Sequence, residues 1–354
     1  MGNVRQYVVK DKQIFVGLED SKKTWKVSVR SEGMEVHFAS MPARYPVLRE
    51  YLGQRFPGCS ISVVYEAGFR GFWLHDLLQA DGIECIVTPP SRVTQARCYS
   101  QKNDTVDARR LATILETKDV QACHVPDRER REDRQISRTL LAYQNDITRT
   151  RNRIRKLVDM HGVGEDLPAG DWAERDYQTI RVRPLAPMLD KVRNALFATL
   201  DHLKAMAKDL HTELKTLTQK ERYSSAVALL SSTPGIGWLT AIRLVLEWGE
   251  DWSRFHSAKH IASYSGLVAS DYSTGESERK GRITGDSASQ VRAWLVQCSW
   301  TAIRKDPVLL DKFRRVWRNS GSKKKAIVAV ARTLVIRLRA LLIHQQPYSI
   351  GLVA

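Results

Sequence analysis

Four carboxylates in the first third of the chain could together hold a divalent metal ion. Glu19 ends a first β-prone run, Glu66 ends another, and Asp104 and Asp107 lie three residues apart at the start of a helical stretch. An i, i+3 pair projects from one face of a helix, so both aspartates can approach carboxylates that strand ends deliver. The group would repel itself unless a cation neutralised it, and Mg²⁺ prefers hard oxygen ligands.

Such a site could hold two metal ions that clamp the attacking and leaving oxygens of a phosphodiester. The alternative interpretation is four separate surface acids, with Asp104 merely capping its helix.

A second set of residues is suited to binding phosphates. The Pro-Gly-Ile-Gly turn at 234–237 has the pattern of a helix-hairpin-helix, in which Gly235 and Gly237 would open onto a helix whose first N–H groups bind a phosphate without reading bases. The alternative is a packing turn. Three consecutive lysines in the basic carboxy-terminal segment suit phosphate contacts too, unless they are simply solvated. They are Lys323, Lys324 and Lys325.

The elements that must position the acids have an α/β pattern. Three β-prone runs separated by turns predict an antiparallel meander at 14–18, 25–30 and 34–39, and a helix follows near 43–54. A strand at 61–66, a helix at 71–82 and a strand at 83–88 then predict a parallel pair, and a helix is expected over 104–118.

The rest of the chain is expected to be mainly helical. Two long amphipathic stretches, 128–160 and 188–222, flank a loop and predict an antiparallel hairpin or an intermolecular coiled coil, with a simple helical spacer as the alternative. From Tyr223 the chain is helical again, with a Gly- and Ser-rich interruption at 263–289. We expect three domains, at 1–124, 125–222 and 223–354.

Composition narrows the class of partner. The 354 residues include 56 Lys and Arg against 39 Asp and Glu, a net charge of +17, which favours a polyanion; nucleic acid leads, and an anionic membrane surface is the alternative. No apolar run approaches the ~18 residues that span a bilayer, and the start lacks a secretion signal, so we expect a cytoplasmic protein. Five cysteines without a CxxC pattern indicate reduced thiols rather than a zinc site or disulfides.

Four segments, in order, resemble the amino-terminal domain of the transposases of insertion-sequence family one hundred and ten, the bridge-RNA-guided recombinases: VGLEDSKKTWKVSV, YEAGFRGFWLHDLL, CIVTPPSRV and KNDTVDARRLA. The resemblance implies an α/β RNase H-like (RuvC-like) fold whose acids, D-E-D-D, hold Mg²⁺. Glu66, Asp104 and Asp107 match the second, third and fourth acids. The first departs from the pattern, because Glu19 stands where the family has Asp; Asp20 should point to the opposite face of an extended segment, so Glu19 is preferred.

The stretch FHSAKHIASYSGLVASDYSTGESERKGRIT resembles the surroundings of the family's nucleophilic serine, which implies a mainly helical carboxy-terminal transposase domain and a phosphoserine link to DNA. Aligned on the glycine, Thr274 takes the serine's place and Ser273 lies one residue earlier. A hydroxyl needs activation, so metal ions of the acidic domain must lie nearby, in a composite site between subunits. The alternative is an ordinary Ser/Thr/Gly loop. The family's Gly-Asn is also absent, and the adjacent basic residues suit phosphate contacts. They are Arg279, Lys280 and Arg282.

The sequence therefore predicts a DNA transposase or recombinase that cuts and rejoins donor and target DNA with a Mg²⁺-dependent acidic site and a Ser/Thr nucleophile. A guide RNA is implied by the resemblance alone, and a homo-oligomer, dimer or tetramer, is expected. Two alternatives are a catalytically impaired relative that still binds nucleic acid and a RuvC-like endonuclease that hydrolyses DNA with water.

Overall fold

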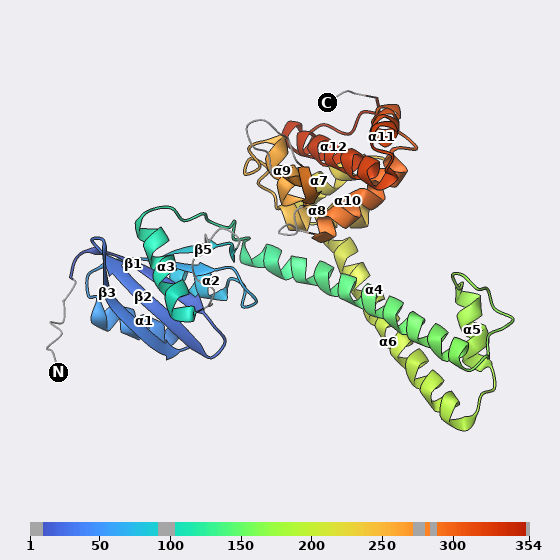
Figure 1. Ribbon diagram of the computed structural model, residues 1–354, viewed down its shortest axis with the longest axis horizontal. Helices are drawn as coiled ribbons and strands as arrows, with labels where there is room; N and C mark the ends of the chain where they lie inside the picture. The colour runs from blue at the N-terminus through green and yellow to red at the C-terminus, as the bar shows by residue number, and fades with distance from the viewer. Residues whose placement is uncertain (1–9, 91–102, 272–279, 284–288, 352–354) are drawn as a thin grey trace. The chain divides into compact units, whose positions relative to one another are not determined.

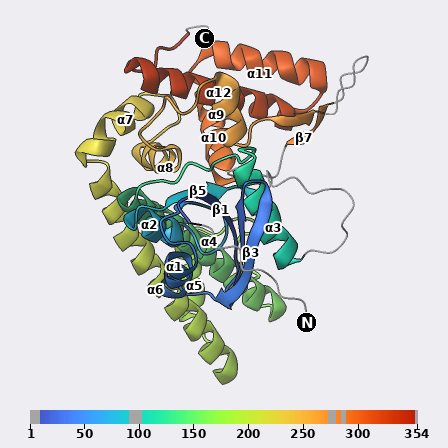
Figure 2. The ribbon, with the colours of Figure 1, turned by 90° about the vertical axis from the view of Figure 1, so that its left-hand side faces the viewer.

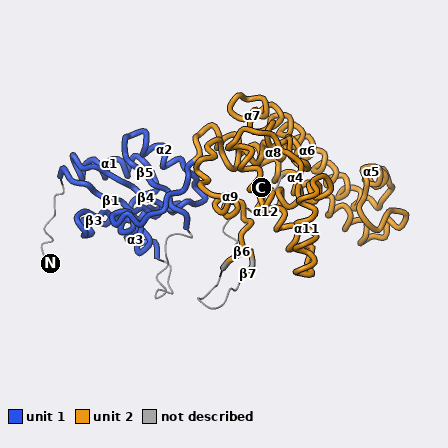
Figure 3. The backbone as a smooth tube through the Cα atoms, turned by 90° about the horizontal axis from the view of Figure 1, so that it is seen from above, with its two compact units in different colours: residues 1–125 blue, residues 126–354 orange. Residues whose placement is uncertain are grey.

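The computed structural model describes residues 10–90, 103–271, 280–283 and 289–351. The chain divides into two compact units, residues 1–125 and 126–354 (Figure 3). No helix in the described ranges is long and apolar enough to cross a membrane.

The amino-terminal unit is built on a five-stranded mixed sheet with the strand order β3-β2-β1-β4-β5 (Figure 1). The strands β1 (Gln13–Asp20), β2 (Thr24–Ser31) and β3 (Met34–Pro42) form the predicted antiparallel meander. The strands β4 (Ser60–Glu66) and β5 (Glu84–Thr88) continue the sheet in parallel with β1. The predicted strand, helix, strand unit is thus present beside the meander.

Helices cover both faces of this sheet. The helices α1 (Tyr45–Arg55) and α2 (Trp73–Ala80) bury leucines against one face, which carries Ile14, Val16 and Leu18 of β1. The helix α3 (Asp104–Glu116) packs on the opposite face. Because side chains alternate along a strand, a run that is apolar at nearly every position is buried on both faces.

The carboxy-terminal unit begins with two long helices that pack against each other, α4 (Arg128–Met160) and α6 (Pro187–Leu217) (Figure 1). The bounds of α4 are those predicted. The helix predicted over 188–222 is wrong at its end, because α6 stops at Leu217 and the next helix starts at Glu221. Leu217 and Tyr223 both lie in the same core, and the turn between them allows both to be buried. The loop predicted between the long helices contains a further helix, α5 (Glu174–Val182).

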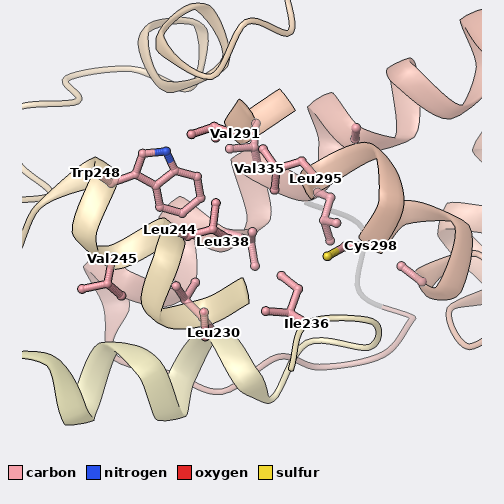
Figure 4. Packing of buried hydrophobic residues seen from close by; sticks show 14 of the residues in the cluster. Leu230, Ile236, Leu244, Val245, Trp248, Val291, Leu295, Cys298, Val335 and Leu338 are labelled. Atoms are coloured by element: carbon pink, nitrogen blue, oxygen red, sulfur yellow. The ribbon is translucent and has the colours of Figure 1, made fainter. Parts of the chain in front are cut away.

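The remaining helices form a bundle with one apolar core, in which Leu244, Val245 and Trp248 lie (Figure 4). All residues from Ala241 to Trp248 are buried. The helices of this bundle are α7 (Glu221–Ser231), α8 (Trp238–Trp248), α9 (Ala258–Tyr264), α10 (Ser289–Ala302), α11 (Pro307–Ser320) and α12 (Lys323–His344). The Gly- and Ser-rich interruption contains two short antiparallel strands that the sequence did not predict, β6 (Ala269–Asp271) and β7 (Lys280–Ile283).

One end of the long helices shares a core with the bundle, whereas their other ends form a separate apolar cluster with α5. Leu140 of α4 and Leu214 of α6 are buried in the same apolar cluster as the bundle helices. Glu247 of α8 forms ion pairs with Arg134 and Arg138 of α4. The segment 125–222, predicted as a domain of its own, is therefore continuous in packing with the segment that follows it.

Candidate active site

The register of the sheet places Glu19 and Glu66 next to each other. The strands β1 and β4 run in parallel, and Leu18 is paired with Tyr65 at the end of their ladder. Glu19 and Glu66 are the next residue of each strand, at the carboxyl ends of two neighbouring strands. The prediction that strand ends deliver these two acids thus has a direct geometric basis.

The face on which the two glutamates lie follows from a close contact between β1 and α3. A Cβ added to Gly17 would lie 2.2 Å from both the carbonyl oxygen of Ala108 and the amide nitrogen of Ala112. Gly17 therefore faces α3, and Glu19, two residues further along the strand, lies on the same face.

Strand β4 gives the same result. Val64 packs with Leu111 and Leu115 of α3. Glu66 is two residues beyond Val64, so it also lies on the face that α3 covers.

The direction of α3 brings its first turn to the same end of the sheet. At the carboxyl end of the helix, Glu116 accepts a 2.6 Å hydrogen bond from Arg30, which is paired with Phe15 near the start of β1. Ala108 lies against Gly17, further along β1. The helix therefore runs opposite to β1, and Asp104 and Asp107, in its first turn, lie toward the end of the strand where Glu19 is found.

The four carboxylates thus come to one end of one face from three different elements. Within the described ranges, however, no three or more His, Cys, Asp or Glu side chains are already arranged to hold a metal ion. Their assignment as metal ligands stays a prediction, and binding of a cation would have to draw the side chains together.

Asp20 is placed on the other face of β1, as expected. Its carboxylate accepts a 2.7 Å hydrogen bond from Trp25 Nε1 and forms a 3.1 Å ion pair with Arg70. Burial raises the pKa of Asp20, although the hydrogen bond from Trp25 and the charge of Arg70 oppose this. The guanidinium of Arg70 also lies over the rings of Trp25 and Trp73. The sequence pattern predicted the face of Asp20 but not these partners.

The Pro-Gly-Ile-Gly turn connects α7 to α8, as a helix-hairpin-helix requires. Gly235 has a φ of +90°, and a Cβ there would lie 2.6 Å from the carbonyl oxygen of Cys298 in α10. Packing against α10 is thus enough to explain this glycine. Gly237 caps α8, and an added Cβ there would meet no atom within 4 Å. Nucleic-acid binding by these two glycines stays a prediction.

The residues predicted around the nucleophile are only partly described. Ser273, Thr274 and Arg279 lie outside the described residues, between β6 and β7. Lys280 and Arg282 are residues of β7. The lysines of the carboxy-terminal segment form the first turn of α12 and are exposed. They are Lys323, Lys324 and Lys325.

Sequence reasoning missed a buried ionic contact between α8 and α4. Glu247 is 8% exposed and bonds to Arg134 and to Arg138, the latter at 3.0 Å. Burial raises the pKa of Glu247, but the two arginines outweigh it, so the net pKa lies below the usual range. The hydroxyl of Tyr264, which ends α9, donates to the carbonyl oxygen of Glu247. A lone Glu in an apolar helix was the available signal, since such a residue is buried only when it is paired.

Comparison with known proteins assigns both units. A family model described as "Transposase IS116/IS110/IS902 family" matches residues 227–314. A second transposase model, for the DEDD domain of IS110 elements, matches residues 16–162, a range that includes all four predicted acids.

Three relatives agree with these matches. The chain is 29% identical over 364 residues to "Putative transposase y4rJ" of Sinorhizobium fredii, which covers 92% of this chain and 90% of that protein. It is 25% identical to the transposase for insertion sequence element IS1111A of Coxiella burnetii, over 83% of this chain and 80% of the relative. A shorter match, 30% identical over 34% of this chain and 38% of the relative, is to the pilin gene-inverting protein of Moraxella bovis. Because transposase models of one family match both units and relatives align over most of their length, the protein belongs to the IS110 family of transposases and is a DNA-recombining enzyme.

Proposed function

We propose that the amino-terminal unit is an RNase H-like, RuvC-like domain in which Glu19, Glu66, Asp104 and Asp107 hold Mg²⁺ during DNA strand cleavage. The observation that carries this proposal is the convergence of the four acids on one end of the sheet face under α3, from β1, β4 and the first turn of α3.

The set of donors fits a hard divalent cation. Carboxylate oxygens are the ligands that Mg²⁺ prefers, and all four donors here are carboxylates. When bound, the ion supplies Lewis-acid polarisation of the phosphodiester and stabilises the leaving oxygen. The role of this chain's residues is to place those oxygens and to keep Asp20 out of the ligand set.

The proposed nucleophile is the hydroxyl of Thr274 or of Ser273, in the connection between β6 and β7. The resemblance of this stretch to the family's serine region and the basic residues that follow it support the assignment. Alignment with the family on the glycine favours Thr274, whereas the less hindered hydroxyl of serine favours Ser273. We also propose a guide RNA, on the resemblance alone, and a dimer or tetramer in which the composite site forms between subunits.

The test is formation of a covalent adduct. The protein is incubated with Mg²⁺, donor and target DNA and the guide RNA encoded beside the element, and a protein–DNA adduct resistant to denaturant is sought on a gel. Asp104→Asn is expected to abolish the adduct while leaving DNA binding intact. The matched control is Asp119→Asn, an exposed acid beyond the far end of α3, which should leave the adduct at the parental level.

Alanine variants separate the two hydroxyls. Loss of the true nucleophile should remove the adduct, whereas loss of its neighbour should cost positioning only, on the order of 10- to 100-fold in rate. If both alanine variants form adducts as well as the parent, the serine-type mechanism is wrong. Nicked DNA without an adduct would instead support an endonuclease, and tight binding without either product would support a catalytically impaired relative.

A further inference from the structure

The last two helices carry a concentration of positive charge that the proposed catalytic site does not use. Between Pro307 and His344, Asp311 is the single acidic residue. Two arginines of this range have structural partners: Arg337 pairs with the buried Asp306, and Arg339 donates to the carbonyl oxygen of Phe255. Among the other cations, Arg315 and Lys325 are exposed, whereas Lys312 and Arg332 are half-buried.

Four of these cations, two from each helix, are called the basic surface: Lys312 and Arg315 of α11 and Lys325 and Arg332 of α12. The helices pack side by side and are joined by a short turn at Gly321, so they run antiparallel (Figure 2). None of the four forms an ion pair with a carboxylate in the described part of the chain.

An ion pair between the two helices sets how their cations meet. Asp306, which caps α11, pairs with Arg337 of α12 at 2.7 Å, so in the antiparallel pair Lys312 lies close to Arg332. In agreement with this, burial lowers the pKa of Lys312, and the charges of Arg315, Arg332 and Arg337 lower it further. The positive charges of Lys312 and Arg332 repel each other in the free protein, and an anion bound between them would relieve this repulsion.

The spacing of cations along the basic surface suits contacts with several phosphates. Lys325 and Arg332 are seven residues apart on α12, which puts them on one face of the helix about 10 Å apart. One strand of a DNA duplex carries a phosphate about every 3.4 Å along the axis, so the basic surface is long enough to reach several phosphates.

A membrane surface is a poorer fit for the same charges. An interfacial helix needs an apolar face toward the lipid. Here Leu309 and Phe313 of α11 and Ile327 of α12 turn their apolar sides into the core of the bundle.

We propose that the basic surface binds the phosphate backbone of a DNA duplex independently of its sequence, and so positions DNA on the carboxy-terminal unit. The inference rests on the proposed function only in taking DNA as the polyanion. It assigns a positioning role to Lys312, Arg315 and Arg332 in addition to the lysines of the α12 start.

The experiment compares two double variants with the same change in charge. Arg315→Glu with Lys325→Glu reverses two exposed members of the basic surface. Lys191→Glu with Lys208→Glu reverses two exposed lysines of α6 as the control. Binding of a labelled 30-base-pair DNA duplex of arbitrary sequence is followed by fluorescence anisotropy without divalent metal, over a range of salt concentrations.

The first variant is expected to bind on the order of 10- to 100-fold more weakly near 0.1 M salt, with a slope of log K against log salt that is smaller by roughly 2. The control should stay within about twofold of the parent, and circular dichroism should show both variants folded. A second duplex of unrelated sequence should lose the same factor.

Three results would overturn the inference: parental affinity and slope in the first variant, an equal loss in the control, or a loss confined to an RNA duplex of the same length. Because no chemistry is measured, a protein that never forms a covalent adduct could still show the expected loss, so the two proposals fail separately.

Discussion

At the scale of single residues, the approach of α3 to the sheet depends on the missing side chain of Gly17. Gly17→Ala would put a methyl group 2.2 Å from backbone atoms of Ala108 and Ala112, and backbone cannot move aside as a flexible side chain can. We expect a loss of about 1–3 kcal/mol or more in the free energy of unfolding of the amino-terminal unit, measured by urea denaturation. Because α3 carries Asp104 and Asp107, cleavage should fall as well.

Gly53→Ala provides the control for this substitution. Gly53 lies within α1, and a Cβ there meets no atom within 4 Å. Alanine in a helix interior is favoured over glycine by roughly 0.5–1 kcal/mol, so this variant should be slightly more stable than the parent. Equal effects from the two substitutions would contradict the close contact of β1 with α3.

A second residue, Asp306, should make stability depend on pH. It is 1% exposed, caps α11 and is paired with Arg337 and Tyr348. Burial raises its pKa, but the hydrogen bond from Tyr348, the backbone N–H groups and Arg337 outweigh this and leave the pKa below its ordinary value of 3.8.

A carboxyl whose pKa is lower in the folded state stabilises the fold fully above its unfolded pKa and loses this effect as the pH falls through the folded value. The parent should therefore lose stability below about pH 4. Asp306→Asn should lack this component and be less stable at pH 7 by about 3 kcal/mol, because the buried Arg337 loses the carboxylate that balances its charge. Thermal melts between pH 3 and pH 7 check this, with the exposed Asp311→Asn as the control; a variant with the parental pH profile would refute it.

At the scale of elements, the attachment of α4 to the bundle depends on Glu247. Glu247→Gln keeps the shape of the side chain but removes the charge that Arg134 and Arg138 face. Breaking a buried ion pair on one side typically costs about 3–5 kcal/mol, and we expect a loss near the lower figure because Arg138 is half exposed and can reach solvent.

Glu132→Gln makes the same chemical change in an exposed pair with Arg128 on α4. Such pairs contribute less than about 1 kcal/mol, so the control should be nearly neutral. The free energy of unfolding of both variants is measured by chemical denaturation. If Glu247→Gln leaves it unchanged, apolar packing alone attaches α4 to the bundle.

At the scale of the whole molecule, the two units should fold separately. The apolar clusters of the sheet domain contain residues only from the first unit, and those of the helical region contain residues only from the second. We expect fragments 1–125 and 126–354 each to give a cooperative thermal transition by circular dichroism, close to a transition of the intact chain. A fragment that is unfolded alone but folded when mixed with the other would contradict separate folding.

By itself the sequence determined the local elements and the kinds of residues that could do chemistry. Alternating or continuous apolar runs gave the strands of the sheet, and three- and four-residue periodicity gave α3 and α4, because these patterns depend on near neighbours. The resemblance of short motifs gave the family, which the comparisons then showed.

Only the tertiary structure decided how those residues are grouped. The faces of Glu19 and Asp20 and the direction of α3 depend on contacts with Gly17, Arg70 and Glu116, which are distant from one another in the sequence. The break after Leu217 has the same origin, since helix periodicity continues through it and only burial in a shared core requires the turn. Long-range packing overrides local propensity at such points, and a single sequence does not reveal it.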